Sequence, residues 1–289
     1  MNNLQDLIIN FAPTGMIPTK EKTPYVPVTA EEIIEDVHKA LEIGITMVHL
    51  HARGEDGKST YKADVFGNII TGIRSFSKDL VICVSLSGRD VNEFEKRAEP
   101  LQLDGDLKPD MGSLTLSSLN FNRTASVNTP DMIQKLALEM KSRGILAELE
   151  AFDAGMINYA RYLERKGFLE PPHYFNLLLG NIACAQADLL HAGIMIRDLP
   201  ENSIWSLAGI GDSQLMMNSI AIISSGGVRV GLEDNIWFDK TRTKLATNSD
   251  LLKRVHRLAQ AHERNIMQPA KLRDLLNLQP GSGKYGRIF

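Results

Sequence analysis

The sequence contains only two cysteines, Cys83 and Cys184, and no apolar run as long as a membrane-spanning helix requires. Two cysteines in 289 residues cannot provide the disulfide framework of a secreted protein, and both lie in apolar stretches typical of core residues. The first ten residues also lack the basic start and apolar run of a signal peptide. We therefore expect a reduced, cytoplasmic protein with no membrane partner.

A strong excess of charge of either sign is missing as well. The chain has 32 Lys and Arg residues against 35 Asp and Glu residues, a formal net charge of -3. This balance gives no electrostatic reason to bind nucleic acid or an acidic membrane, and it favours a small-molecule substrate. The length and the 43% hydrophobic content allow one large core. We expect residues 1–289 to form a single domain.

Short apolar runs rich in β-branched residues alternate with longer amphipathic segments, which is the pattern of repeated βα units. The runs cover residues 7–12, 46–51, 80–86, 112–116, 145–151, 174–179, 203–208 and 227–231. An open doubly wound sheet usually stops at five or six strands, whereas eight units are typical of a closed barrel. The sequence therefore predicts an α/β fold, a (β/α)8 TIM barrel.

Helical periodicity separates the runs. The clearest helix begins after Thr29, whose hydroxyl and the Glu32 carboxyl three residues later form a capping box. Other helices are predicted at residues 132–142, 214–223 and 249–262.

The last stretch, residues 276–289, is rich in Gly and Lys and ends in apolar Ile288 and Phe289. We expect a C-terminal arm that lies on the barrel or on a neighbouring subunit, with disorder as the alternative.

The strongest local signal for chemistry is a pair of histidines at the end of the second run. His49 and His51 are two residues apart, so in a strand their side chains point to the same face. Barrel enzymes place their sites at the carboxyl ends of strands, and two imidazoles there make half of a zinc site. Buried histidines bonded to the backbone are the alternative for this spacing taken alone.

A third metal ligand is expected from another strand end, and Glu233 is the candidate. The last apolar run ends in Glu233 and Asp234, a costly pair in a core unless a cation compensates them. A solvated loop is the alternative. Arg229 shares the strand parity of Glu233, so we expect it to point into the barrel and to pair with Asp234 or with a substrate carboxylate.

Further polar side chains occur at other predicted strand ends. Glu148 and Glu150 share one face of the fifth run, where they either face a cationic site or act as structural anchors. Ser85, Ser113 and Thr115 offer hydroxyls that can orient carbonyl or carboxylate oxygens.

Together these motifs resemble those of the β-keto acid cleavage enzymes, along nearly the whole chain. They are Ala12-Pro13-Thr14-Gly15 with Thr23-Pro24 and Pro27; Val48-His49-Leu50-His51-Ala52-Arg53; Pro109-Asp110-Met111 with Ser113-Leu114 and Asn120-Phe121; Glu148-Leu149-Glu150 with Phe152-Asp153; and Arg229-Val230-Gly231-Leu232-Glu233-Asp234-Asn235. The resemblance implies a zinc-dependent (β/α)8 barrel, usually a tetramer. It also implies that a β-keto acid and acetyl-CoA exchange to give acetoacetate and a new acyl-CoA.

The resemblance assigns roles to the residues that match the family's motifs. It makes His49, His51 and Glu233 the zinc ligands, although the same donors also suit Fe(II), Mn(II) or Co(II). It makes Arg229 and Asp234 the base assembly.

Other matched positions concern the substrate and a further acid. The family's functional glutamate falls on Glu148 or Glu150, and both remain open. The positions that hold the β-keto acid are Thr14, Ser85, and either Ser113 or Thr115.

Two positions depart from the family. Members that act on an amino-substituted acid have a glutamate two residues after the glycine of the first motif, which binds the substrate ammonium; the residue here is Ile17. An apolar side chain cannot compensate a buried cation, so we expect an uncharged acyl tail. The loop Ser87-Gly88-Arg89 lacks the paired glycines usual in the family, which leaves the contacts with CoA open.

Two other functions fit parts of the pattern. A metal-dependent TIM-barrel lyase of the aldolase type, or a hydrolase, would use the same ligands; amidohydrolases place their His-x-His after the first strand, unlike this chain. A non-catalytic protein that binds a metal or an acyl ligand is the third possibility. The presence of both Arg229 and Asp234 argues against it, since a binding protein needs no base.

Overall fold

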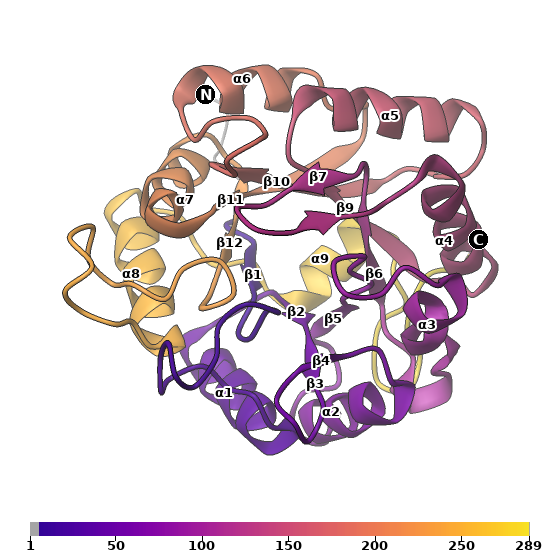
Figure 1. The fold of residues 1–289 in the computed structure, drawn as a ribbon, viewed down its shortest axis with the longest axis horizontal. Coiled ribbons are helices and arrows are strands. Elements are labelled where there is room, and N and C mark those ends of the chain that lie inside the picture. Colours follow the sequence, from indigo (N-terminus) through magenta and orange to yellow (C-terminus); the bar gives the residue numbers. More distant parts are fainter. Residues whose placement is uncertain (1–5, 289) are drawn as a thin grey trace.

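The computed structural model describes residues 6–288 and shows eight parallel strands closed into a barrel (Figure 1). The barrel strands are β1 (Ile9–Phe11), β2 (Met47–Leu50), β5 (Val81–Val84), β6 (Met111–Thr115), β9 (Leu146–Ala151), β10 (His173–Leu179), β11 (Ser203–Gly209) and β12 (Gly227–Val230). Each pairs with the next, and β12 pairs with β1 to close the ring. The predicted (β/α)8 barrel is confirmed, and each predicted run overlaps one of the strands.

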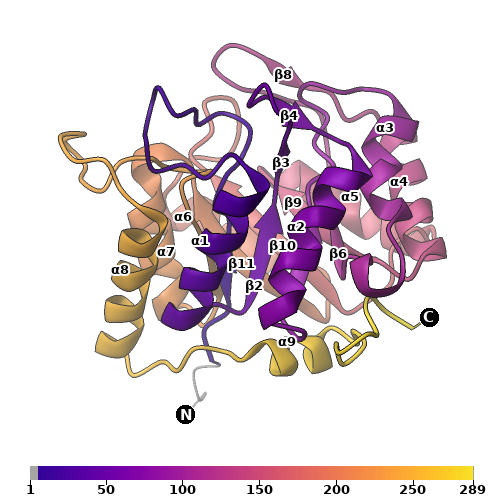
Figure 2. The same ribbon diagram turned by 90° about the horizontal axis from the view of Figure 1, so that it is seen from below.

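The helices surround the barrel, except the last one, which lies across one end of it (Figures 1 and 2). They are α1 (Ala30–Ile43), α2 (Ala63–Phe76), α3 (Phe94–Ala98), α4 (Pro130–Ser142), α5 (Ala154–Arg165), α6 (Leu189–Arg197), α7 (Gln214–Ile223), α8 (Asn248–Ala261) and α9 (Pro269–Leu275), with 3₁₀ turns at Glu99–Gln102, Gly105–Leu107 and Gly211–Ser213. The predicted capping box is present, because Thr29 accepts from the Glu32 N–H and the Glu32 carboxylate accepts from the Thr29 N–H. Over residues 6–288, none of the helices is both long and apolar enough to cross a bilayer.

The two ends of the barrel differ, and we call them the mouth and the floor. The mouth is the end where the strands finish. Two short hairpins rise above it (Figure 2), formed by β3 (Ala52–Arg53) with β4 (Ser59–Thr60) and by β7 (Leu119–Asn120) with β8 (Ala125–Ser126). The floor, where the strands begin, is covered by α9 and by residues 276–288 (Figure 2). The sequence analysis predicted neither α9 nor the hairpins.

The floor is sealed by apolar side chains and by buried Asp110, which pairs with Arg273 and, at 3.9 Å, with Arg74. Met47, Val81 and Met111 lie inside the barrel with Leu272 and Leu276 of the α9 region. Below them the Asp110 carboxylate accepts both guanidinium N–H groups of Arg273, at 2.9 and 2.8 Å, and the backbone N–H groups of Ile82 and Gly286. The segment 276–288 thus packs on the barrel of its own chain.

The inward-facing side chains of the strands change from apolar at the floor to polar toward the mouth. Alternate residues of a strand point to the same face, so Met47 is followed inside the barrel by His49 and then His51. The same alternation leads from Leu146 to Glu148 on β9. The interior therefore changes from apolar to polar along the barrel axis, and the polar part opens at the mouth.

Candidate active site

Three side chains predicted as metal ligands converge at the mouth. His49 Nε2 lies 3.3 Å from His51 Nε2, and His51 Nε2 lies 3.1 Å from Glu233 Oε1. One ligand atom from each residue lies within 4.8 Å of the others. His49 lies in β2 and His51 follows directly after its end, while the turn after β12 supplies the glutamate.

These three residues fit a divalent cation. Both imidazoles are buried, and Glu233 Oε2 is a buried carboxylate oxygen with no hydrogen-bond partner among residues 6–288. Burial raises the pKa of Glu233, but Arg229 and the two histidines outweigh it and hold that pKa well below its ordinary value, so the carboxylate is ionised. Two imidazole nitrogens and one carboxylate oxygen, with a further position open, form the usual ligand set of a catalytic zinc site.

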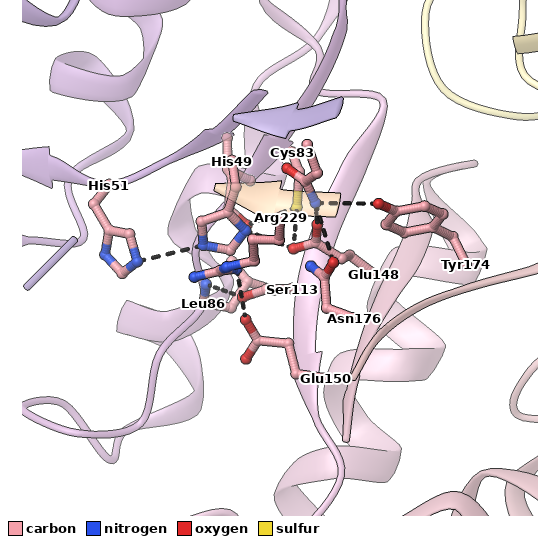
Figure 3. Close-up of polar contacts among 12 residues, drawn as sticks. His49, His51, Cys83, Leu86, Ser113, Glu148, Glu150, Tyr174, Asn176 and Arg229 are labelled. Atoms are coloured by element: carbon pink, nitrogen blue, oxygen red, sulfur yellow. Dashed lines mark hydrogen bonds and ion pairs between the residues drawn. The ribbon is translucent and has the colours of Figure 1, made fainter. Parts of the chain in front are cut away.

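A buried carboxylate orients the first histidine. Glu148 Oε2 lies 2.5 Å from His49 Nδ1 and accepts from the Cys83 thiol at 3.2 Å (Figure 3). The carboxylate also accepts from Asn10 Nδ2 at 2.8 Å. Burial raises the pKa of Glu148, but the interactions with His49 prevail and lower it to about 2. An ionised Glu148 accepts a hydrogen bond from the Nδ1–H group of His49, and in this tautomer Nε2 presents its lone pair toward His51.

Arg229 joins three carboxylates beside the candidate metal ligands. Its Nη2 donates to Glu233 Oε1 at 2.6 Å, its Nε donates to Asp234 Oδ2 at 3.1 Å, and its Nη1 lies 3.5 Å from Glu150 Oε1. The expected pairing with Asp234 is therefore present. Burial raises the pKa of Asp234, and Arg229 only partly opposes this, so its carboxylate is a stronger base than an exposed aspartate.

The turn that carries the two acids depends on a glycine. A Cβ on Gly231 would lie 1.9 Å from the carbonyl oxygen of Ala12, so only glycine allows the end of β12 to approach β1 this closely. This approach brings Glu233 and Asp234 over the barrel.

The predicted hydroxyl groups take different positions around the cluster. Thr115 Oγ1 donates to Glu150 Oε2 at 2.7 Å, and Ser113 Oγ accepts from the Leu86 N–H at 3.0 Å. Thr14 is fully buried, and within residues 6–288 its hydroxyl has no partner. Ser85 has no side-chain hydrogen bond within the described chain.

A cleft of about 400 Å³ opens beside His51. Its walls are formed by Met16, His51, Ser59, Thr60, Tyr61, Phe66, Ser85, Leu86, Ser87, Asp90, Val91 and Arg97. Met16 belongs to the loop after β1, and the next residue, Ile17, is half exposed. The cleft can therefore admit a reactant to the candidate ligands between that loop, the β3–β4 hairpin and the loop after β5.

Two functional contributions escaped the sequence analysis. Asn10, Asn176 and Tyr174 form a buried polar network beneath Glu148, with Asn10 Nδ2 3.2 Å from Asn176 Oδ1 and 3.3 Å from Tyr174 Oη. Asparagines at inward positions of apolar runs are the signal that could have revealed it. The second is Arg53, which donates to the carbonyl oxygens of Gly15, Pro18 and Gly57 and so ties the first loop to the β3–β4 hairpin.

The fold and the position of this cluster at the carboxyl ends of the strands are those of a TIM-barrel enzyme. The chain belongs to the β-keto acid cleavage enzyme family, whose model matches residues 6–278. That family consists of acetyl-CoA-dependent transferases that cleave β-keto acids.

Characterised relatives match almost end to end. The chain is 35% identical over 278 residues to the 3-keto-5-aminohexanoate cleavage enzyme of Fusobacterium nucleatum, covering 96% of this chain and 99% of the relative. It is 34% identical over 277 residues to the 3-oxoadipate:acetyl-CoA acetyltransferase of Cupriavidus necator, covering 95% of each. Among solved structures, apo ObcA superposes with a TM-score of 0.77 at 19% identity, over 88% of this chain and 65% of that chain. At this identity the likeness shows the fold alone, and this chain spans about two thirds of the ObcA length.

Proposed function

We propose that this protein condenses a β-keto acid with acetyl-CoA and releases acetoacetate and a new acyl-CoA. The observation that carries the proposal is the convergence of His49, His51 and Glu233 with the Arg229–Asp234 pair beside them, at the end of the barrel where enzymes of this fold react. Family membership and the acetyl-CoA transferase names of several relatives support the same reaction class.

Atom balance defines the bonds involved. The acyl part of the β-keto acid leaves on CoA, so acetoacetate must combine the CH2–COO⁻ unit of that acid with the acetyl group. A bond therefore forms between C2 of the β-keto acid and the acetyl carbonyl carbon, and the CoA thiolate leaves. The thiolate then adds to the original C3 carbonyl, and the C2–C3 bond breaks.

The residues of the cluster suit these steps. Asp234 takes the C2 proton and returns it to C2 after the C2–C3 bond has broken, and its raised pKa suits both transfers. Arg229 holds Asp234 in place, and Glu150 fixes the remaining edge of Arg229. Glu148 keeps the lone pair of His49 Nε2 directed at the ligand position. We propose zinc as the ion held there; a bound divalent cation polarises the keto group as a Lewis acid.

Product analysis tests this function. Purified protein is mixed with acetyl-CoA and a plain alkyl β-keto acid, and acyl-CoA and acetoacetate are measured by mass spectrometry. We expect both products in equal amounts, loss of both after chelation, and recovery when zinc is added back. Consumption of the acid without acetyl-CoA would instead point to an aldolase-type lyase or a hydrolase. Elemental analysis of the untreated protein identifies the metal.

We also propose that the acyl tail of the substrate is uncharged. The support is Ile17, an apolar residue next to Met16 of the cleft wall. A panel comparing an alkyl β-keto acid with its 5-amino counterpart tests this: kcat/KM is expected to be higher for the alkyl acid. The opposite preference would overturn the proposal.

We also propose that the protein is a homotetramer and that it is located in the cytoplasm. Its support is a group of exposed apolar side chains on the neighbouring helices α6 and α7, formed by Leu189, Leu190, Leu215, Met216 and Ile223. Light scattering on a gel-filtration column tests the assembly, with a mass four times the 32.1 kDa of the chain as the expected result. The free thiols of Cys83 and Cys184 suit a reducing compartment, which cell fractionation tests.

A further inference from the structure

Arg89 reaches over the mouth from the loop that follows β5. Its guanidinium carbon lies 3.6 Å from the centre of the Phe121 ring, in the β7–β8 hairpin. Phe121 in turn meets Phe152 edge-on, with ring centres 6.1 Å apart, just beyond the end of β9. The side chain therefore extends from the end of β5 past β6 toward β9. Stacking on an aromatic ring fixes the plane of the guanidinium and leaves its N–H edges free to bind.

The chain neighbours of Arg89 line the cleft. Ser87 before it and Asp90 after it both line the cleft beside His51. The Arg89 backbone N–H donates to Ser87 Oγ, which fixes the turn of the loop. The loop that carries Arg89 therefore borders the cleft, and Glu150 and Glu233 at the mouth are near enough to act electrostatically on its charge.

Within residues 6–288, the guanidinium of Arg89 has no ion-pair partner. The carboxylates that face it are Asp90, Glu150 and Glu233, yet within residues 6–288 none of them forms an ion pair with it. Its Nε is buried and makes no hydrogen bond in the described chain. Burial lowers the pKa of Arg89, although a guanidinium remains charged at neutral pH.

Arg97, in the same region, is an arginine whose guanidinium is fully hydrogen-bonded to the protein, and it serves as a comparison for Arg89. Its Nε donates to the Leu86 carbonyl, its Nη1 to the Val127 carbonyl and its Nη2 to Asn128 Oδ1. Every nitrogen of Arg97 is therefore used to join loops. A partly buried, preorganised guanidinium without such partners is costly unless a bound anion compensates it.

We propose that Arg89 binds the carboxylate of the β-keto acid and is a specificity-determining residue that selects acids over neutral ketones. The proposal rests on the proposed function, because it takes its ligand from that reaction. The planar fork of a guanidinium matches a carboxylate. A diphosphate of CoA suits the position less well, since the three facing carboxylates repel a multiply charged anion more strongly than a single carboxylate.

Binding measurements without acetyl-CoA test the proposal. Isothermal titration calorimetry compares acetoacetate, the simplest acid of the class, with its neutral methyl ester. The variants are Arg89→Gln, Arg89→Lys and Phe121→Leu, and the control is Arg242→Gln, which alters an exposed arginine paired with Asp212. Each variant is first checked for an unchanged thermal melting curve, and the series is repeated on chelator-treated protein.

We expect Arg89→Gln to weaken acetoacetate binding roughly 10- to 100-fold, the range for losing a charged hydrogen-bond pair, with little change for the ester. Arg89→Lys keeps the charge and should retain part of the affinity, and Phe121→Leu should cause a smaller loss of the same kind. Arg242→Gln should match the wild type. The Arg89 effect should persist on chelator-treated protein.

Several results would overturn the proposal. They are equal losses for acid and ester, unchanged acetoacetate binding in Arg89→Gln, a wild type that does not prefer the acid, or weakened binding of CoA alone. Failure of the proposed function looks different, because acid selectivity would then depend on Arg89 while no acyl-CoA forms in the turnover assay.

Discussion

The mouth of the barrel buries Arg229 among three carboxylates, and the floor buries Arg273 against one, Asp110. The two ends differ in how completely their buried polar atoms are hydrogen-bonded. At the floor, both oxygens of Asp110 are occupied, by two N–H groups of Arg273 and by two backbone N–H groups. At the mouth, Glu233 Oε2 and the Thr14 hydroxyl are buried without partners among residues 6–288. A saturated buried ion pair holds elements together, whereas unused polar atoms are what a reactant or a cation can bind. The following changes test this contrast, from the largest expected effect to the smallest.

Asp234→Asn should affect activity far more than stability. Removing the proposed base is expected to lower kcat roughly 10²- to 10⁴-fold, while an amide of the same shape keeps a hydrogen bond to Arg229. Steady-state kinetics gives kcat, and urea unfolding of the same preparation gives the free energy of unfolding. An activity close to that of the wild type would remove Asp234 from the chemistry.

Arg273→Ala should affect stability far more than activity. The change removes the hydrogen-bonded counterion of buried Asp110 and leaves only Arg74, whose Nη2 lies 3.9 Å from Asp110 Oδ2. Removing one partner of a buried ion pair typically lowers the free energy of unfolding by about 3–5 kcal/mol. Urea unfolding measures it. Lys271→Ala is the control on the same helix, because its ion pair with Asp6 is exposed and should contribute less than about 1 kcal/mol. Equal losses of unfolding free energy in Arg273→Ala and Lys271→Ala would contradict the stabilising role of the buried ion pair at the floor.

Glu148→Gln and Glu150→Gln should separate the two acids of one strand. Glu148 orients a proposed metal ligand, and losing such a partner typically lowers metal affinity about 10- to 100-fold. Glu150 contacts Arg229 and Thr115 instead, so its loss should lower turnover and leave metal affinity unchanged. Competition with a chromogenic zinc chelator measures the affinities. Identical zinc affinities in the two variants would argue that Glu148 does not orient the metal ligand while Glu150 acts only through Arg229.

His173, at the start of β10, should give the smallest effect. Burial lowers the pKa of His173 and prevails over Glu164, whose carboxylate oxygen lies 3.1 Å from Nε2, while Arg287 acts in the same direction as burial. The unfolded chain therefore takes up this proton first as the pH falls below about 6.5, so stability declines from there toward the lower folded-state pKa. The slope for one proton is at most about 1.4 kcal/mol per pH unit. The free energy of unfolding is measured by urea unfolding between about pH 7 and pH 5. In His173→Gln it should depend less on pH than in the wild type. An unchanged dependence would show that His173 does not cause it.

The sequence predicted the barrel because each strand has its own apolar run and each run is followed by a helical pattern. It also predicted the convergence of His49, His51 and Glu233, since strand parity and the direction of parallel strands place all three at one end. Contacts between strands could not be predicted in the same way. The bonds of Asn10 and Glu148 depend on the lateral register of strands that are far apart in the sequence. Arg89 was noted only as a departure from the family loop, because its stacking partner belongs to a hairpin that the pattern did not reveal.

Arg53 has a consequence for redesign of the enzyme. By holding the carbonyl oxygens of Gly15 and Pro18 it clamps the backbone on both sides of Met16 and Ile17, while leaving those two side chains unconstrained. New side chains at these two positions would be displayed on an unchanged backbone. Tail preference could therefore be altered by exchanging two side chains, without rebuilding the loop that carries them.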